Sequence, residues 1–296
     1  MLAIIIPYFK LSFFEATLES LANQTDKRFK VYVGDDTSPE DCSILLEKYR
    51  GKFEFTYFRF ENNLGSTSLP KQWKRCIELS GNEEWLMILG DDDVLANNVV
   101  QNFYTNLPEI KTERVSVIRF ATQVIDGLGN NIDSLHTHPK QMKASESFWR
   151  KYEGKSRSSL SEYIFNRKSY LKYEFHEYPL GWYSDDMAWL EFSNFQNIYS
   201  INDANVLIRI SEKSISGQSN NHVQKSEATY LFYYNLSNKY LSHFSKQQRL
   251  KCIARVEREY FKNKSFSLLF KIIKWHLTKT DLFNLIKFIR RIYINF

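Results

Sequence analysis

The first 125 residues alternate short apolar runs with segments of helical periodicity, and this alternation restricts the possible folds more than any other feature of the chain. Each run has the length of a strand, whereas each segment between two runs is long enough for a helix. Strands and helices that alternate in this way predict a doubly wound, mostly parallel α/β sheet. The strands are expected at residues 3–6, 30–34, 53–60, 85–89 and 115–125.

Acidic residues follow two of these predicted strands. Asp35 and Asp36 end the second strand, and Asp91, Asp92 and Asp93 follow the fourth. Ligands bind at the carboxyl ends of the strands in such sheets, and adjacent carboxylates repel one another unless a cation lies among them. Mg²⁺ or Mn²⁺ takes such oxygen ligands together with substrate phosphates. The alternative is a solvated acidic loop or a helix start, where aspartate is favoured by capping and by the helix dipole.

Two shorter patterns concern helix starts. Ser38 followed by Pro39 predicts the N-cap and the first position of a helix that runs to about residue 49. Asp185 and Asp186 precede an apolar stretch and can cap a helix over residues 187–195.

Charge is distributed unevenly along the chain. Residues 246–296 carry 13 Lys and Arg against three acidic residues, while the rest of the chain carries 27 basic and 31 acidic residues. Residues 265–296 interleave basic and apolar side chains at helical spacing, as in helices that lie on anionic membranes. The alternative is that their apolar faces pack against the rest of the protein or a second subunit. No nucleic-acid-binding module is recognisable, so no nucleic acid is expected as a partner.

Two absences indicate the compartment. The three cysteines form no CxxC pair, which is typical of reduced thiols in a cytoplasmic protein. No run approaches the roughly 20 apolar residues that span a bilayer. We therefore expect a cytoplasmic protein, held peripherally at the inner face of the cell membrane by its basic end.

Five short motifs carry a resemblance to a known family. They are IIIPYF at residues 4–9, VGDDTS at 33–38, ENNLG at 61–65, MILGDDDVL at 87–95 and GWYSDDMAW at 181–189. In this order they resemble family 2 glycosyltransferases of the bacterial cell-surface polysaccharide type. The resemblance implies a GT-A fold, an α/β doubly wound mixed sheet, with a helical C-terminal extension.

The resemblance also implies a division of the chain. Residues 1–215 would form the glycosyltransferase domain, with nucleotide-sugar binding in about 1–125 and the acceptor side in 126–215. Residues 216–296 would form a helical region that ends in the amphipathic basic tail.

Site residues follow from the same resemblance, position by position. It implies contacts with the nucleotide-sugar at Pro7, Tyr8, Asp35 or Asp36, Asn62, Gly65, Lys74 and Asp91. It implies Asp92 as the direct ligand of Mn²⁺ or Mg²⁺, supported by Asp93, while the family's usual first aspartate of this region aligns with Gly90. It implies Asp186 as the catalytic base, with Asp185 in place of the usual glutamate.

The implied activity is metal-dependent, inverting transfer of a hexosyl or N-acetylhexosaminyl group. The donor would be a UDP- or GDP-sugar, and the acceptor a saccharide, lipid-linked in this interpretation, in polysaccharide, O-antigen or capsule assembly. A sugar nucleotidyltransferase is one alternative, but it needs a glycine-rich triphosphate loop, and residues 4–10 contain no glycine. A non-catalytic sugar-binding or scaffold protein at the membrane, with a decayed site, is the other alternative.

Overall fold

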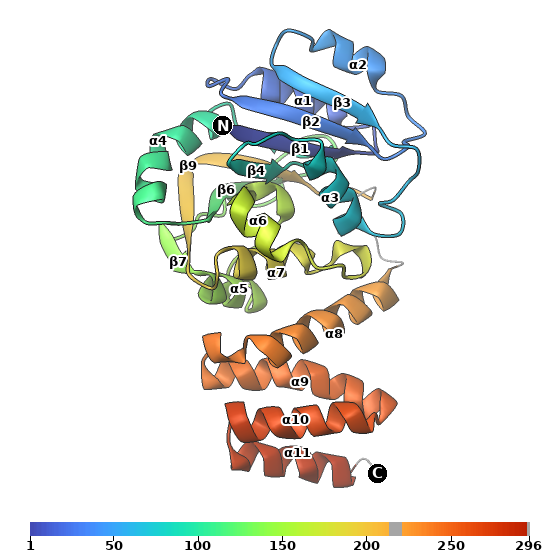
Figure 1. The fold of residues 1–296 in the computed structure, drawn as a ribbon, viewed down its shortest axis with the longest axis vertical. Helices are drawn as coiled ribbons and strands as arrows, with labels where there is room; N and C mark the ends of the chain where they lie inside the picture. Colours follow the sequence, from blue (N-terminus) through green and yellow to red (C-terminus); the bar gives the residue numbers. More distant parts are fainter. Residues whose placement is uncertain (213–220, 295–296) are drawn as a thin grey trace. The chain divides into compact units, whose positions relative to one another are not determined.

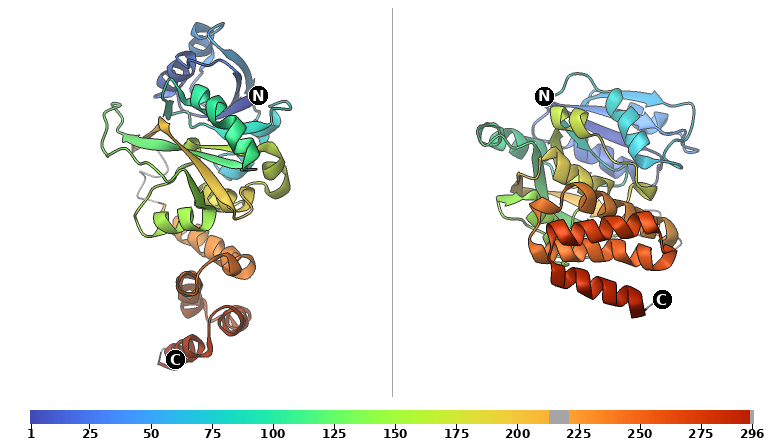
Figure 2. Two further views of the ribbon diagram at one scale, coloured as in Figure 1. Left: turned by 90° about the vertical axis from the view of Figure 1, so that its left-hand side faces the viewer. Right: turned by 60° about the horizontal axis from the view of Figure 1, so that its bottom comes forward.

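The computed structural model describes residues 1–212 and 221–294. The chain divides into two compact units, the first from Met1 to Asn221 and the second from His222 onward. Figures 1 and 2 show a unit of mixed strands and helices and a unit of helices alone. The domain boundary expected at residues 215 and 216 lies outside the described residues, as do the last two residues of the predicted basic tail.

Within residues 1–212, nine strands form one mixed sheet. They are β1 (Leu2–Tyr8), β2 (Phe29–Asp35), β3 (Glu54–Arg59), β4 (Trp85–Ile88), β5 (Val94–Leu95), β6 (Val117–Ile125), β7 (Gln141–Lys143), β8 (Tyr163–Asn166) and β9 (Asn197–Arg209). Their order is β3-β2-β1-β4-β8-β6-β9-β5, and β7 pairs with β9.

The strand directions place several carboxyl ends at one edge. β1 is parallel to both β2 and β4, and β2 is parallel to β3. β8 runs antiparallel to β4 and to β6, so β6 and its parallel neighbour β9 run in the same direction as β4. The chain segments that follow β1, β2, β4, β6 and β9 therefore all leave from this edge, which positions the site.

Seven helices accompany these strands in the first unit as described. They are α1 (Phe14–Ala22), α2 (Ser43–Lys48), α3 (Leu69–Glu78), α4 (Val99–Thr112), α5 (Ala144–Tyr152), α6 (Arg167–Tyr173) and α7 (Ser184–Phe192). Two single-turn 3₁₀ helices, η1 (Leu160–Glu162) and η2 (Pro179–Gly181), precede β8 and α7. The α/β sheet predicted from the sequence is confirmed.

Burial on both faces explains why β1 reads as an unbroken apolar run. All five residues from Leu2 to Ile6 are fully buried, as expected for a strand covered on both sides. On one face, Ile4 and Ile6 belong to a core that includes Phe14 and Leu18 of α1. On the other face α3 packs closely against β1 and β2.

Two boundaries in the first 50 residues differ from those predicted. β1 continues through Pro7 to Tyr8, because parallel pairing with β2 extends to the end of the strand. The helix predicted from Ser38 begins only at Ser43. Ser38 instead ties the loop after β2 to the loop after β1, since its hydroxyl donates to the carbonyl of Phe9 at 2.6 Å.

The second unit is a series of helices, each packed against the one before it. It contains α8 (His222–Lys239), α9 (Lys246–Asn263), α10 (Phe266–Lys279) and α11 (Leu282–Ile294), with the 3₁₀ turn η3 (Leu241–His243) after α8. Figure 2 shows this stack of helices in its right-hand view. The predicted helical C-terminal region is confirmed. Among residues 1–212 and 221–294, no helix is both long and apolar enough to cross a membrane.

Candidate functional site

The acidic cluster after β4 connects the carboxyl ends of two parallel strands. The carboxylate of Asp91 accepts hydrogen bonds from the backbone N–H groups of Phe9 and Lys10, at 2.7 and 2.8 Å. Because Phe9 and Lys10 follow β1 directly, Asp91 holds the loop after β1 against the end of β4. One member of the cluster therefore has a positioning role within the protein.

Asp93 connects the same cluster to β9. Its Oδ1 accepts a hydrogen bond from the backbone N–H of Arg209 at 2.9 Å, and the Arg209 Nε donates to the carbonyl of Asp92 at 3.0 Å. On the other side, the backbone N–H of Gly90 donates to the Ser161 hydroxyl at 2.9 Å. The cluster is thus fixed by β1, β9 and η1 together.

Crowding and burial shift the protonation of all three aspartates. Burial, together with the charge of Asp92, raises the pKa of Asp91 to about 6 and that of Asp93 to about 7. Burial also raises the pKa of Asp92, against the opposing charges of Lys10 and Arg209. Raised pKa values mean that negative charge is under-compensated here, and a bound cation would relieve it.

Two carboxylate oxygens of this cluster converge beside Gly90. A Cβ placed on Gly90 would lie 2.9 Å from Oδ1 of Asp92 and 3.0 Å from Oδ2 of Asp93. These are hard oxygen ligands of the kind that Mg²⁺ and Mn²⁺ take, usually with substrate phosphates and water as the other ligands. Over the described parts of the chain, no three His, Cys, Asp or Glu side chains form a complete metal site. Asp92 and Asp93 could supply two oxygen ligands to such an ion, and the other ligands would have to come from a substrate and water.

Asp35 and Asp36, at the end of β2, are both buried and fully engaged. Asp35 accepts hydrogen bonds from the backbone N–H of Ser38 at 2.8 Å, the Tyr57 hydroxyl at 2.7 Å and the Arg59 guanidinium at 2.7 Å. Asp36 accepts the backbone N–H groups of Leu64 and Gly65, each at 2.8 Å. These carboxylates shape the loops around the site.

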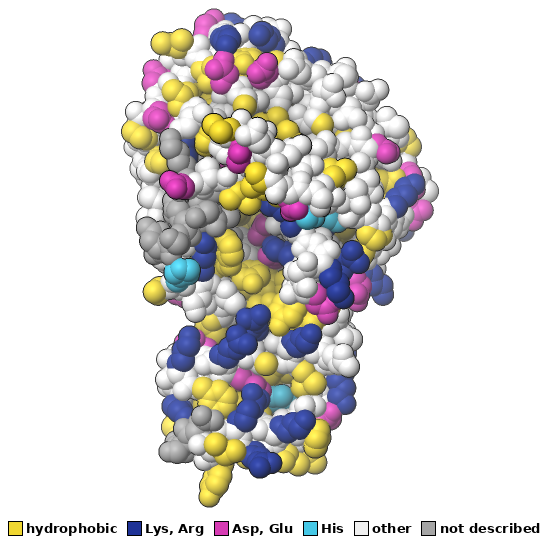
Figure 3. Space-filling view, turned by 180° about the vertical axis from the view of Figure 1, so that it is seen from behind, with side chains coloured by type: hydrophobic (Ala, Val, Ile, Leu, Met, Phe, Trp, Pro, Cys, Tyr) yellow, Lys and Arg dark blue, Asp and Glu magenta, His cyan; other side chains and the backbone are white. Residues whose placement is uncertain are grey.

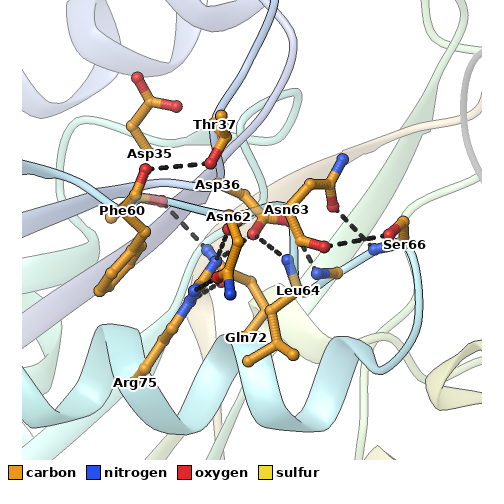
Figure 4. A network of polar contacts seen from close by, with 12 residues as sticks. Asp35, Asp36, Thr37, Phe60, Asn62, Asn63, Leu64, Ser66, Gln72 and Arg75 are labelled. Carbon is orange, nitrogen blue, oxygen red and sulfur yellow. Dashed lines mark hydrogen bonds and ion pairs between the residues drawn. The ribbon is translucent and has the colours of Figure 1, made fainter.

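Arg75 completes the network around Asp36. It extends from α3 to pair with the Asp36 carboxylate and donates to Oδ1 of Asn62 at 2.8 Å (Figure 4). Gly65 is required at its position because a Cβ there would lie 2.5 Å from Oδ2 of Asp36. Asn62 and Gly65 therefore form one wall with Asp36, fixed from α3.

The remaining predicted nucleotide contacts differ in accessibility. Pro7 is half-buried at the end of β1, opposite Gly34. Tyr8 is fully buried, and its hydroxyl donates to the carbonyl of Glu40 at 2.7 Å; burial raises its pKa. Lys74 forms a surface ion pair with Glu174 at 2.8 Å.

A second acidic pair lies in the first turn of α7. The residue before the helix, Tyr183, adopts a left-handed φ of 68°, and α7 begins at Ser184. Asp185 and Asp186 are thus in the helix and do not cap it. Both oxygens of Asp186 accept hydrogen bonds from the ammonium group of Lys151 on α5, at 2.8 and 2.7 Å.

The two carboxylates of this pair have different surroundings. Asp186 is only 5% exposed, whereas Asp185 is partly exposed. Burial and the charge of Asp186 raise the pKa of Asp185 to about 7, against the opposing charge of Lys151. Burial alone would lower the pKa of Lys151, but the charges of Asp186 and Asp185 outweigh it and raise that pKa. The raised pKa of Asp185 places its change of protonation near neutral pH.

The segment from η1 to β8 connects the two acidic clusters. Its Ser161 contacts Gly90 of the first cluster, and the ring of Tyr163 stacks on Trp189 of α7 with 4.2 Å between centroids. Between them, the buried Glu162 accepts a hydrogen bond from Arg119 Nε of β6 at 2.6 Å. The fold thus brings residues 91–93 and the first turn of α7 to a common scaffold.

Sequence patterns did not indicate the residues that support the two clusters. Lys151 and Asp186 are 35 positions apart, and Ser161 and Gly90 are 71 positions apart. No local spacing rule connects such pairs. The role of Arg209 in holding the first cluster depends on the pairing of β9 with β6, which no local pattern indicates.

Comparison with known proteins identifies the family. The model of glycosyl transferase family 2 matches residues 3–172, which is more than half of the chain. The chain belongs to glycosyl transferase family 2. The resemblance inferred from its motifs is confirmed, as are the GT-A fold and the glycosyltransferase class. The match includes Asp91–Asp93 and ends before Asp185.

Solved structures support the same fold. S. aureus TarS 1-349 in complex with UDP-GlcNAc is 14% identical, with a TM-score of 0.66 over 93% of this chain and 79% of that chain. The same TarS fragment in complex with UDP is 16% identical, with a TM-score of 0.61 over 93% and 80% of the two chains. No curated protein sequence matches the chain.

Proposed function

We propose that this family 2 glycosyltransferase transfers a hexosyl or N-acetylhexosaminyl group from a UDP-sugar to a saccharide acceptor, with inversion and with the help of Mn²⁺ or Mg²⁺. The observation that carries the proposal is the pair of acidic clusters on a common scaffold, one suited to a cation and the other containing a carboxylate that titrates near neutrality. The choice of UDP over GDP is supported by the TarS structures, which hold UDP-GlcNAc and UDP.

The first cluster would bind the diphosphate of the donor, which links the nucleoside to the sugar. Asp92 and Asp93 would supply oxygen ligands to the ion, while Asp91 keeps the loop after β1 in place. A bound divalent ion would stabilise the charge of the departing nucleoside diphosphate. In this proposal the nucleoside lies against the wall formed by Pro7, the Tyr8 backbone, Asp35, Asp36, Asn62 and Gly65.

As the catalytic base we propose Asp185 in place of Asp186, the residue that the resemblance implied, because Asp185 is partly exposed whereas both oxygens of Asp186 are bound to Lys151. A base is most effective when its pKa lies near the working pH, and the pKa of Asp185 is raised to about 7. It would take the proton of the acceptor hydroxyl as that oxygen attacks the anomeric carbon. The bond from that carbon to the diphosphate oxygen breaks, and its electron pair leaves with the nucleoside diphosphate. Asp186, held by both oxygens on Lys151, would fix the first turn of α7 and keep the pKa of Asp185 high.

The second unit supports a membrane-bound, lipid-linked acceptor on the cytoplasmic side. Figure 3 shows Lys and Arg side chains interspersed with apolar side chains on one face of this unit. Four side chains of α11 form an exposed apolar strip with the spacing i, i+4, i+7 and i+11, on one side of the helix. This apolar strip of α11 consists of Leu282, Ile286, Ile289 and Tyr293. Such strips with basic flanks bind anionic membrane surfaces.

Donor hydrolysis, with water as the acceptor, tests the proposal without knowledge of the true acceptor. UDP-GlcNAc and UDP-glucose are incubated with the protein and Mn²⁺, and proton NMR records the anomer released first. We expect the β-anomer from these α-linked donors. Asp185→Asn should lower the rate at least about 100-fold, the usual range for loss of a general base, while UDP still binds.

Three results would contradict parts of the proposal. Release of the α-anomer first would show retention and would exclude the inverting mechanism. Full activity of Asp185→Asn, with activity lost in Asp186→Asn despite an unchanged melting temperature, would transfer the role of base to Asp186. Absence of UDP binding and of donor turnover would favour a non-catalytic scaffold.

A further inference from the structure

A groove with basic and apolar walls lies wholly within the second unit, between α9, α10 and α11. Its volume is about 450 Å³. The side chains that line it are Leu250, Ala254, Glu257, His276, Asn284, Lys287, Arg290, Arg291 and Ile294. The groove is independent of the sugar-transfer site in the first unit and has no role in the proposed chemistry there.

The floor of the groove contains the buried carboxylate of Glu257, which is bound to His276 and Arg291. Glu257 and His276 are 2% and 3% exposed, and Oε1 of Glu257 lies 2.8 Å from Nε2 of His276. The other carboxylate oxygen accepts a hydrogen bond from Arg291 at 2.5 Å. Both oxygens of Glu257 are therefore engaged inside the unit, which weakens its repulsion of an anion in the groove.

The rim of the groove adds positive charge. Lys287 and Arg290 are both exposed, and the Lys287 ammonium lies 4.2 Å from the centroid of the Phe283 ring. Lys287, Arg290 and Arg291, together with the carboxylate of Glu257, give the groove a net charge of +2. Guanidinium and ammonium groups of this kind recognise phosphate oxygens.

The apolar part of the lining distinguishes a lipid phosphate from other phosphates. Leu250, Ala254 and Ile294 line the same groove as the three cations. On α11 the two exposed cations of the rim, Lys287 and Arg290, directly follow Ile286 and Ile289 of the apolar strip of α11. A ligand with a phosphate next to apolar chains satisfies both kinds of surface at once.

We propose that this groove binds the phosphate headgroup of an anionic membrane lipid, with Lys287 and Arg290 as its principal contacts. The proposal rests on the membrane contact in the proposed function and makes it more specific, because it assigns that contact to a defined binding site. The apolar strip of α11 enters the bilayer interface, and the groove beside it holds one headgroup.

Vesicle sedimentation of the intact protein tests this site. Vesicles of phosphatidylcholine alone are compared with vesicles that also contain phosphatidylglycerol. Lys287→Gln/Arg290→Gln removes two charges from the groove. The matched control, Lys239→Gln/Lys262→Gln, removes two charges from exposed positions on α8 and α9. A nearby Lys or Arg contributes roughly a fivefold factor in affinity, so we expect the groove variant to bind phosphatidylglycerol vesicles about 25-fold more weakly and the control to lose far less.

Each other outcome overturns a specific part of the proposal. Equal losses in the two double variants would mean that diffuse charge attracts the protein, and the groove would not be a site. Displacement of the vesicles by submillimolar inorganic phosphate would make the groove a site for free phosphate. No binding of the intact protein to either vesicle would refute the membrane contact and the groove together.

Two further measurements separate the groove from the claims it rests on. If Ile286→Ser/Ile289→Ser releases the protein from vesicles but Lys287→Gln/Arg290→Gln does not, the membrane contact stands and the groove site is wrong. Titration of UDP reports on the first unit alone. Vesicle binding through the groove without UDP binding would refute the proposed transfer from a UDP-sugar and leave the lipid site intact.

Discussion

Removal of the Arg119 side chain should destabilise the first unit strongly. Arg119 and Glu162 are 2% and 0% exposed and are joined at 2.6 Å. In Arg119→Leu the Glu162 carboxylate stays buried and keeps the hydrogen bonds from the backbone N–H and hydroxyl of Ser159, at 3.1 and 2.8 Å. Loss of one partner of a buried ion pair costs about 3–5 kcal/mol. Because Ser159 compensates for part of this loss, we expect a decrease of about 3 kcal/mol in the free energy of unfolding.

Urea unfolding followed by tryptophan fluorescence measures this loss in the relevant unit. Five of the six tryptophans belong to the first unit and only Trp275 to the second. The double variant Arg119→Leu/Glu162→Leu removes both charges and should recover most of the stability, since apolar replacement of a whole buried pair is often neutral. The reasoning would be refuted by a loss below about 1 kcal/mol in Arg119→Leu, or by a double variant no more stable than the single one.

Two further predictions concern the site directly. Gly90→Ala places a Cβ within 3.0 Å of two carboxylate oxygens of the first cluster and should weaken metal-dependent UDP binding by about 10-fold or more, as changes around metal ligands usually do. Calorimetry measures this affinity, and the control is Gly127→Ala, whose Cβ meets only one atom at 3.9 Å. Equal affinities of the two variants for UDP would contradict a metal site formed by these oxygens. The pH profile of kcat/KM should rise through an acid limb near pH 7, because the base form of Asp185 is the deprotonated one and its pKa is raised to about 7. Lys151→Gln removes a charge that lowers this pKa and should move the limb to higher pH, so a limb that stays in place would exclude Asp185 as the titrating group.

Five of the nine strands (β1, β2, β3, β4 and β6) and the positions of the acidic clusters were predictable because they depend on local patterns. Burial on both faces makes β1 a continuous apolar run, and the acidic residues at the ends of β2 and β4 mark where those strands end. Short pairings were not predictable: β5 has two residues and exists because Val94 and Leu95 pair with the long strand β9. Sequence periodicity needs several repeats, and two residues provide none.

Helix starts, like short strands, depend partly on contacts between residues far apart in the sequence. Ser38 and Pro39 have the composition of a helix start, yet Ser38 bonds to Phe9 across the sheet edge and the helix begins later. The pairing of Lys151 with Asp186 likewise depends on α5 packing against α7. The sequence indicated where acidic groups gather, but it could not show which carboxylate is neutralised by a neighbour and which titrates.

Calorimetric titration of UDP tests the central claim, a cation-dependent nucleotide site at residues 91–93. The protein is titrated with UDP in Mn²⁺ and again in EDTA, and both titrations are repeated with Asp92→Asn. The account predicts binding in Mn²⁺, little or none in EDTA, and loss of the Mn²⁺-dependent binding in the variant. UDP binding of equal strength in all four titrations would contradict the account, because the ion and the Asp92 carboxylate would then have no part in holding the diphosphate.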